Sequence, residues 1–71
     1  MTNAESLIRA GMAEAKIKSV SELGLRIGMK RSTLARRLKH PSTFIASEIL
    51  AIGNVLGWSN EKLGELIRSE E

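Results

Sequence analysis

Hydrophobic residues recur along the whole chain at the spacing of an α-helix, and no alternating stretch is long enough to predict a strand. Two capping-box patterns, Thr2-x-x-Glu5 and Ser19-x-x-Glu22, predict where the first two helices begin. Gly28 is expected to end the second helix, because glycine adopts the left-handed backbone most easily. The inner faces of these helices are expected at Leu7, Ile8, Met12 and Ala15, and at Val20, Leu23 and Ile27, with residues 16–18 as the connection between them.

The same pattern predicts three more helices. A third helix is expected from Lys30 or Arg31 to about His40, since the residue before Pro41 is pushed out of the helical region. Residues 41–44 are expected to form a loop. A fourth helix ends at Gly57, and Ser59 is expected to cap a fifth. Their apolar faces are expected at Leu34 and Leu38, at Ile45, Ile49, Ile52 and Leu56, and at Leu63, Leu66 and Ile67. The predicted fold is all-α, a compact bundle of five short helices in one domain spanning residues 1–71.

Length and composition narrow the classes of function. A chain of 71 residues forms one small domain with a marginal core. It has no cysteine, no aspartate and a single histidine, His40. These counts exclude disulfides and thiolate metal sites, and they leave no residues for a catalytic triad. We therefore expect no enzymatic activity, no metal, no cofactor and no small-molecule ligand.

Nothing in the sequence predicts a membrane segment or a targeting signal. The first five residues lack the basic and apolar stretches of a signal peptide. The longest nearly apolar stretch, Ile49 to Trp58, is interrupted by Gly53, Asn54 and Gly57 and is far shorter than the roughly 20 residues of a membrane helix. The expected location is the cytoplasm.

The basic residues are concentrated in the middle of the chain. The net charge is +3, and no acid occurs between Glu22 and Glu48. That interval contains Arg26, Lys30, Arg31, Arg36, Arg37 and Lys39, together with His40, whereas Glu61, Glu65, Glu70 and Glu71 lie near the end. This uneven distribution of charge favours a polyanionic partner, and nucleic acid is the first candidate. The alternative is an ordinary solvated helix face.

The spacing between residues 19 and 39 predicts a helix-turn-helix. Leu23, Ile27, Met29 and Leu34 supply the apolar contacts, Gly24 the small residue at the closest approach and Gly28 the turn. The segment 21–34, SELGLRIGMKRSTL, resembles the repressor and Cro-like helix-turn-helix family of phages and bacteria, the lambda-repressor-like domains. The resemblance continues through Arg36-Arg37-Leu38-Lys39, Pro41-x-Thr43-Phe44 and Gly57-Trp58-Ser59, and it covers about residues 5 to 68.

Two positions depart from the family pattern. Val20 stands where the family often has a glutamine that contacts a phosphate. Arg37 stands where an apolar residue is common. We expect Leu38 to take over that packing, with Arg37 pointing toward solvent or DNA.

The resemblance implies a role in DNA binding for most residues of the third helix, whose N-terminal half would read bases in the major groove. Arg31 is the foremost candidate, because its guanidinium matches guanine O6 and N7. The base-reading set implied is Lys30, Arg31, Ser32, Ala35 and Arg36. The phosphate-contacting set implied is Ser19, Arg26, Arg37, Lys39 and His40.

The family usually binds two half-sites as a dimer, so the resemblance implies a homodimer on a palindromic operator. The expected dimer contact comprises Trp58, Leu63, Leu66 and Ile67. The alternative for the last three is the ordinary inner face of the fifth helix. For Trp58, as for Phe44, core packing is favoured over stacking on unpaired bases.

The expected function is therefore sequence-specific binding of double-stranded DNA by a small transcriptional regulator, of phage or prophage type, that occupies an operator. Two alternatives stay open. The first is a protein-interaction adaptor or antitoxin-type module with the same helical fold. The second is a basic amphipathic peptide that acts on membranes, which the capped helices and the internal glycine turn disfavour.

Overall fold

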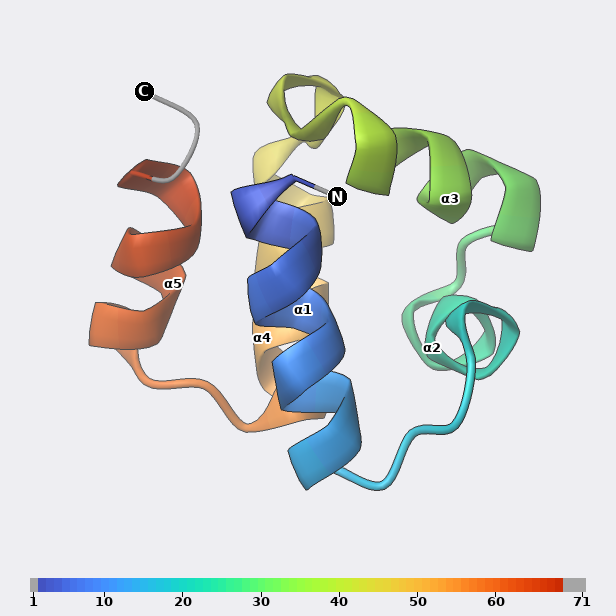
Figure 1. Cartoon of the computed structure of the whole chain (residues 1–71), viewed down its shortest axis with the longest axis horizontal. Helices are drawn as coiled ribbons and strands as arrows, with labels where there is room; N and C mark the ends of the chain where they lie inside the picture. Colours follow the sequence, from blue (N-terminus) through green and yellow to red (C-terminus); the bar gives the residue numbers. More distant parts are fainter. Residues whose placement is uncertain (1, 69–71) are drawn as a thin grey trace.

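The computed structural model describes residues 2–68, which form five α-helices and one short 3₁₀-helix without any strand (Figure 1). The elements are α1 (Asn3–Glu14), α2 (Val20–Ile27), α3 (Arg31–Lys39), η1 (Pro41–Thr43), α4 (Ala46–Leu56) and α5 (Asn60–Arg68). The predicted all-α fold of five short helices is confirmed. Glu70 and Glu71, counted in the acidic end of the chain, lie outside the described residues.

The three predicted side-chain caps are present. The hydroxyl oxygens of Thr2, Ser19 and Ser59 accept hydrogen bonds from backbone N–H groups three residues ahead, at 3.0, 3.1 and 3.3 Å. Each bond satisfies a donor that the first turn of a helix would otherwise leave unpaired. Helices α1, α2 and α5 therefore begin where the sequence predicts.

The two predicted glycine stops are confirmed as well. Gly28 ends α2 with φ of 76°, and Gly57 ends α4 with φ of 70°. Both lie in the left-handed region, which costs a residue with a Cβ about 1 kcal/mol or more.

The segment after α3 differs from the expected loop, because Pro41–Thr43 forms the 3₁₀-helix η1. The fixed φ of Pro41 suits the first position of a helical turn. The Thr43 hydroxyl donates to the His40 carbonyl at 2.6 Å, and the Phe44 N–H donates to the Pro41 carbonyl at 3.1 Å. The chain therefore passes from α3 to α4 through an ordered turn.

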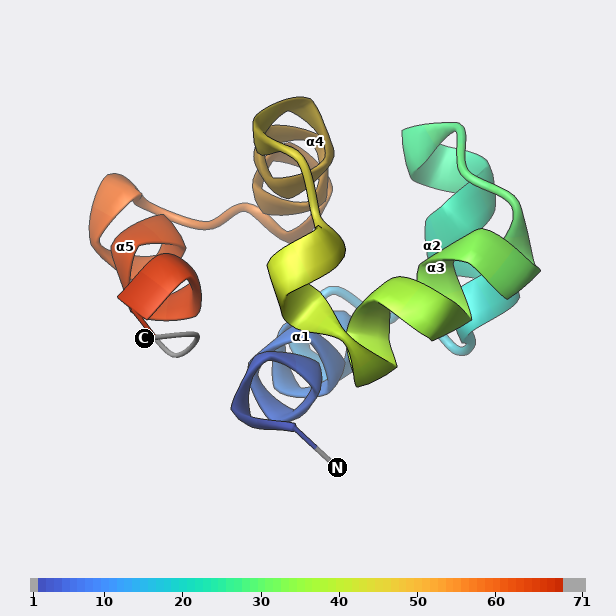
Figure 2. The same ribbon diagram turned by 90° about the horizontal axis from the view of Figure 1, so that it is seen from above.

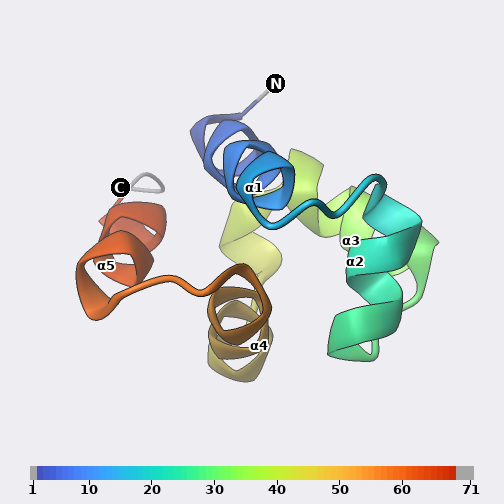
Figure 3. The ribbon, with the colours of Figure 1, turned by 90° about the horizontal axis from the view of Figure 1, so that it is seen from below.

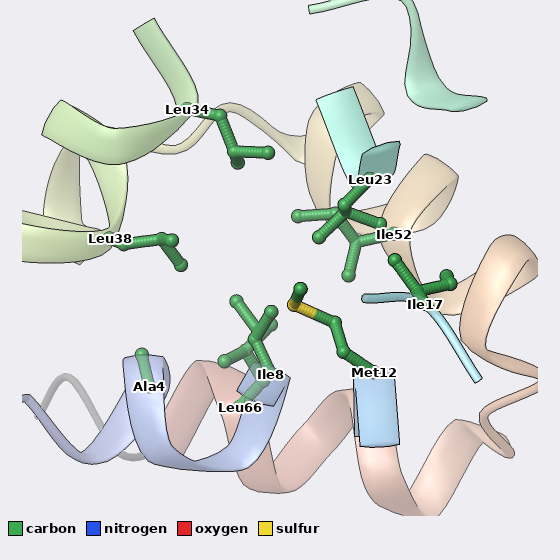
Figure 4. Close-up of a cluster of buried hydrophobic side chains, with 9 residues drawn as sticks. All are labelled: Ala4, Ile8, Met12, Ile17, Leu23, Leu34, Leu38, Ile52 and Leu66. Atoms are coloured by element: carbon green, nitrogen blue, oxygen red, sulfur yellow. The ribbon is translucent and has the colours of Figure 1, made fainter. Parts of the chain in front are cut away.

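All five α-helices contribute side chains to a single core, drawn in Figure 4. Among the described residues, Ile8, Leu23, Leu34, Leu38 and Ile52 are the largest that are fully buried. Ala4 and Ile17 are also buried, although the sequence pattern did not single them out for the core. Ile17 lies in the connection between α1 and α2 and closes one end of the cluster.

One residue of the predicted α4 stripe is not in the core. Ile45 is 57% exposed, because it precedes α4 as the N-cap residue, outside the helical repeat. The buried stripe of α4 therefore begins at Ile49 and centres on Ile52.

Helices α1 and α4 lie between α5 on one side and the pair α2–α3 on the other, as the views from above and below show (Figures 2 and 3). The helix-turn-helix and the fifth helix thus occupy opposite ends of the molecule. In the described part of the chain, every helix is too short or too polar to cross a membrane.

Candidate nucleic-acid interface

Helices α2 and α3 form a helix-turn-helix. The connection of three residues begins at Gly28, and the Met29 N–H donates to the Gly24 carbonyl at 2.8 Å. In Figure 1, α2 is seen end-on while α3 runs across the view, so the two helices cross steeply. Leu23 and Leu34 are fully buried and hold them against the rest of the core. This is the arrangement that the sequence predicts for residues 19–39.

Gly24 lies where the turn approaches α2 most closely. A Cβ at this position would be 2.6 Å from the Met29 carbonyl oxygen, which is closer than real Cβ atoms come to a neighbour. The neighbour is backbone, so it cannot rotate away as a side chain would. The tight turn therefore requires glycine here.

The exposed side of α3 carries most of the predicted DNA-contacting side chains. Leu34 and Leu38 are buried one turn apart, and the residues on the opposite side of the helix face solvent. Ala35 is half-buried at the edge of that side. The exposed residues of the predicted set on α3 and its flanks are Lys30, Arg31, Ser32, Arg36, Lys39 and His40.

Four cations on this surface have no ion-pair partner among residues 2–68: Lys30, Arg31, Arg36 and Lys39. Arg9, Arg26, Arg37 and Lys62 each pair with a glutamate, and the other cations without such a pair among residues 2–68, Lys16, Lys18 and Arg68, are scattered over other parts of the fold. Uncompensated positive charge on an exposed helix that is about 13 Å long, at 1.5 Å per residue, suits a groove lined by phosphates.

Two predicted phosphate contacts lie on α2. Ser19 is exposed at its N-terminus, where free backbone N–H groups and the helix dipole favour an anion. Arg26 pairs with Glu22 on the same helix at 3.2 Å, but its side chain is exposed. An exposed pair of this kind contributes only about 0.3–0.5 kcal/mol, so a phosphate can displace it.

Arg37 is oriented differently from the prediction. Its side chain is only 24% exposed and turns back onto the segment that follows α3. Nη1 donates to the Thr43 carbonyl at 2.8 Å, and Nη2 donates to Glu48 at 3.4 Å. The expectation that Arg37 points toward solvent or DNA is therefore wrong, although the expectation that Leu38 takes the core position is confirmed.

Sequence reasoning missed the partner of Arg37. Glu48 lies in the first turn of α4, eleven residues further along the chain, and its side chain is 16% exposed. No periodic pattern joins these two positions, because η1 and the start of α4 lie between them. The only available signal was that Glu48 is the first acid after the basic interval.

Val20, the other departure from the family pattern, is half-buried and packs against the core. Its side chain packs against apolar neighbours and, unlike that of glutamine, has no polar atom to contact a phosphate.

The four residues predicted for a dimer contact differ in how far they are buried, and only Ile67 is exposed. Leu66 is only 2% exposed and belongs to the core, so its assignment to a dimer contact is wrong. Trp58 is half-buried and packs against the core, close to Gly11, as the alternative of core packing predicts. Leu63 is half-buried against Gly53 of α4.

The outer surface of α4 and α5 is apolar. Ile67 is 54% exposed and Leu50 is 56% exposed, and they line the same shallow groove. The other lining residues are Ala46, Ile49, Asn60, Leu63 and Gly64. The accessible apolar surface near α5 therefore involves Ile67 and Leu50, in place of Leu66 and Trp58.

Comparisons with protein-family models, with curated proteins and with solved structures find no significant match to this chain.

Proposed function

We propose that this protein is a sequence-specific binder of double-stranded DNA that acts as a small transcriptional regulator. One observation supports the proposal best: the exposed side of α3 and its N-terminal flank, in a helix-turn-helix, carry four cations without ion-pair partners among residues 2–68. The likeness of segment 21–34 to the repressor and Cro-like family agrees with this proposal.

In the proposed mechanism, α3 lies in the major groove and its N-terminal half reads base edges. Arg31 is the first residue of α3, and its planar guanidinium pairs with guanine O6 and N7. Ser32 and Arg36 lie on the same side, and Ala35 is small enough to contact a thymine methyl group. Lys39, His40 and the N-terminus of α2 bind phosphates on either side of the groove.

We further propose that a second copy of the chain binds through the outer surface of α4 and α5. Exposed apolar residues at Leu50 and Ile67 support this assignment. α5 lies at the end of the molecule away from α2 and α3, so a dimer through α5 and the adjoining side of α4 leaves both recognition helices accessible. Bound to a palindromic operator in the cytoplasm of a bacterium, such a dimer excludes or recruits polymerase.

Selection of duplexes from a random pool by the purified protein tests the proposal. We expect a palindromic consensus with two half-sites about one helical turn apart, near 34–36 Å. Binding to the selected duplex should weaken steeply as salt rises, because each neutralised phosphate releases counterions.

A pool that yields no enriched sequence, together with no duplex retained at low salt, would contradict the proposal. That outcome would favour an adaptor or antitoxin-type module whose partner is another protein, for which the apolar surface of α4 and α5 is the available site.

A further inference from the structure

Arg37 and Glu48 connect the recognition helix to the start of α4. Arg37 lies in the last turn of α3, on the flank between the buried leucines and the exposed side. Its Nη2 is 3.4 Å from Glu48 Oε2, and its Nε is 3.3 Å from Glu48 Oε1. The Nε is buried and has no aligned hydrogen bond, so the ion pair is its sole polar contact among the described residues.

Both ends of this contact are held by backbone. The Arg37 Nη1 donates to the Thr43 carbonyl at 2.8 Å, which ties it to η1. The Glu48 Oε1 accepts the Ile45 N–H at 3.0 Å, which fixes the carboxylate at the N-terminus of α4. A mostly buried pair with further hydrogen bonds at each end is directional and difficult to rearrange.

Most of the remaining contacts of α3 with the core are less directional. Leu34 and Leu38 hold the helix by apolar packing, which resists separation more than rotation about the helix axis. The hydrogen bond from the Thr2 hydroxyl to the Leu38 carbonyl, at 2.9 Å, holds a backbone atom at the C-terminal end of α3 and not its flank. The position of Arg31 and Arg36 in a groove depends on that rotation. A fixed contact on the flank of α3 therefore sets where their side chains point.

We infer that Glu48 and Arg37 are positioning residues that determine DNA specificity without touching DNA, by fixing the rotation of α3 through η1 and α4. This inference rests on the proposed function, because an effect on DNA specificity requires that α3 binds in a groove of DNA. The contact itself is a property of the fold, and it can be tested without DNA.

The sign of one substitution separates this role from simple electrostatics. Glu48 is an acid close to a basic surface, so its neutralisation should strengthen binding to any duplex if charge alone matters. If Glu48 positions α3, then Glu48→Gln raises the affinity for random duplex but lowers the ratio of operator affinity to random-duplex affinity. We expect that ratio to fall roughly fivefold to tenfold, the effect of one weakened charged hydrogen bond.

Glu22→Gln is the matched control. Glu22 also lies in the first turn of its helix, accepts a backbone N–H, that of Lys18, at 3.3 Å and pairs with an arginine. Its arginine, Arg26, is on the same helix, so the pair connects no two elements. Both substitutions change the net charge equally, and only Glu48→Gln should lower the ratio.

Arg37→Met tests whether Arg37 contacts phosphate directly. A phosphate contact contributes about one unit to the dependence of log affinity on log salt. The double variant Arg37→Met/Glu48→Gln keeps the net charge of the pair, and we expect it to show the reduced ratio with an unchanged salt slope. A slope lower by one unit would overturn the inference in favour of direct contact.

Amide hydrogen exchange in the free protein provides the readout that needs no DNA. Glu48→Gln should speed exchange in the last turn of α3 and in η1 more than in α1, whereas a general loss of stability speeds exchange throughout. Equal changes along the chain, or none, would overturn the inference. If wild-type protein binds no duplex, the proposed function fails, and the exchange pattern still decides the role of Glu48.

Discussion

Arg31 and Lys39 carry the same charge at opposite ends of α3. Because their positions differ, we expect their substitution to change DNA affinity in different ways. Arg31 begins the helix, in the half that the proposed mechanism places in the groove, whereas Lys39 ends it, where that mechanism places the backbone of the duplex. We expect Arg31→Ala to weaken operator binding by about 1–3 kcal/mol and random-duplex binding by less. Titration of both variants against operator and random duplex measures the difference.

Lys39→Ala serves as the comparison within the same experiment. Loss of a phosphate contact should weaken both duplexes about equally and reduce the salt slope by about one. Equal losses on the two duplexes for Arg31→Ala would mean that Arg31 reads no base.

Gly24→Ala should destabilise the domain, because the added Cβ would lie 2.6 Å from the Met29 carbonyl oxygen. The backbone of the turn must move, and such overpacking costs about 1–3 kcal/mol. The gain in helix propensity from alanine, about 1 kcal/mol, offsets part of this cost. Thermal denaturation of wild type and variant measures the net change.

Gly64→Ala is the control for that experiment. Its added Cβ would meet only the flexible end of Arg68, at 3.1 Å. We expect unchanged or slightly higher stability, since the propensity gain has little to oppose it. A stabilising effect of Gly24→Ala as large as that of Gly64→Ala would contradict the close approach at the turn.

Single residues differ in how far their roles can be predicted from sequence. Ser19 and Gly28 were predictable because a cap and a left-handed stop depend on the few residues around them. Ile45 was wrongly placed in the core, since its spacing to Ile49 fits a helix that in fact starts one residue later. The start of α4 depends on the bond between the Ile45 N–H and Glu48, which hydrophobic spacing does not reveal.

At the scale of elements, the N-terminus of α1 supports the C-terminal end of α3. The Thr2 hydroxyl oxygen accepts the Glu5 N–H at 3.0 Å, and the same hydroxyl donates to the Leu38 carbonyl at 2.9 Å. One side chain thus caps α1 and satisfies a carbonyl at the end of α3, where no helical partner remains. The two helices are joined by a contact between residues that are 36 positions apart.

Thr2→Ala should therefore lower the free energy of unfolding by more than the loss of a helix cap alone would. The cap contributes about 1 kcal/mol and the bond to the Leu38 carbonyl a further 0.5–1.5 kcal/mol. Each kcal/mol lowers the midpoint of thermal unfolding by about 4–8 °C in a domain of this size. Circular dichroism melting curves measure the shift.

Two further variants serve as controls for Thr2→Ala. Thr2→Ser keeps the hydroxyl and should melt close to wild type. Ser59→Ala removes a cap with no bond to another helix and should have a smaller effect than Thr2→Ala. Identical shifts for Thr2→Ala and Ser59→Ala would show that the contact between α1 and α3 adds no stability.

Contacts between elements are the part of the candidate site that sequence patterns did not predict. The helix-turn-helix was predictable, because its glycines and apolar residues lie within one continuous segment. The Arg37–Glu48 pair and the Thr2–Leu38 bond join separate segments, and their formation depends on how the helices pack. For this reason the predicted orientation of the Arg37 side chain is wrong, although the predicted helix that contains Arg37 is confirmed.

At the scale of the whole molecule, size limits how two copies can bind one operator. The principal extents are 27 × 22 × 22 Å, less than the spacing of about 34–36 Å between half-sites one turn apart. Two copies in contact can span that spacing only if their recognition helices lie away from the contact. A contact through α5 and the adjoining side of α4 meets this condition, because α5 lies at the opposite end of the molecule from α2 and α3 (Figure 2).

Ile67→Glu should therefore abolish dimer formation without unfolding the domain. Ile67 is 54% exposed, so a charged side chain remains solvated in the monomer but is buried without a partner in the dimer. Affinity for a duplex with one half-site should stay unchanged, while affinity for the full operator falls about a hundredfold as linked binding is lost. Leu25→Glu, on α2 and 83% exposed, is the control for oligomeric state in sedimentation velocity. An Ile67→Glu protein that sediments as wild type and retains full-operator affinity would exclude the outer surface of α4 and α5 as the dimer contact.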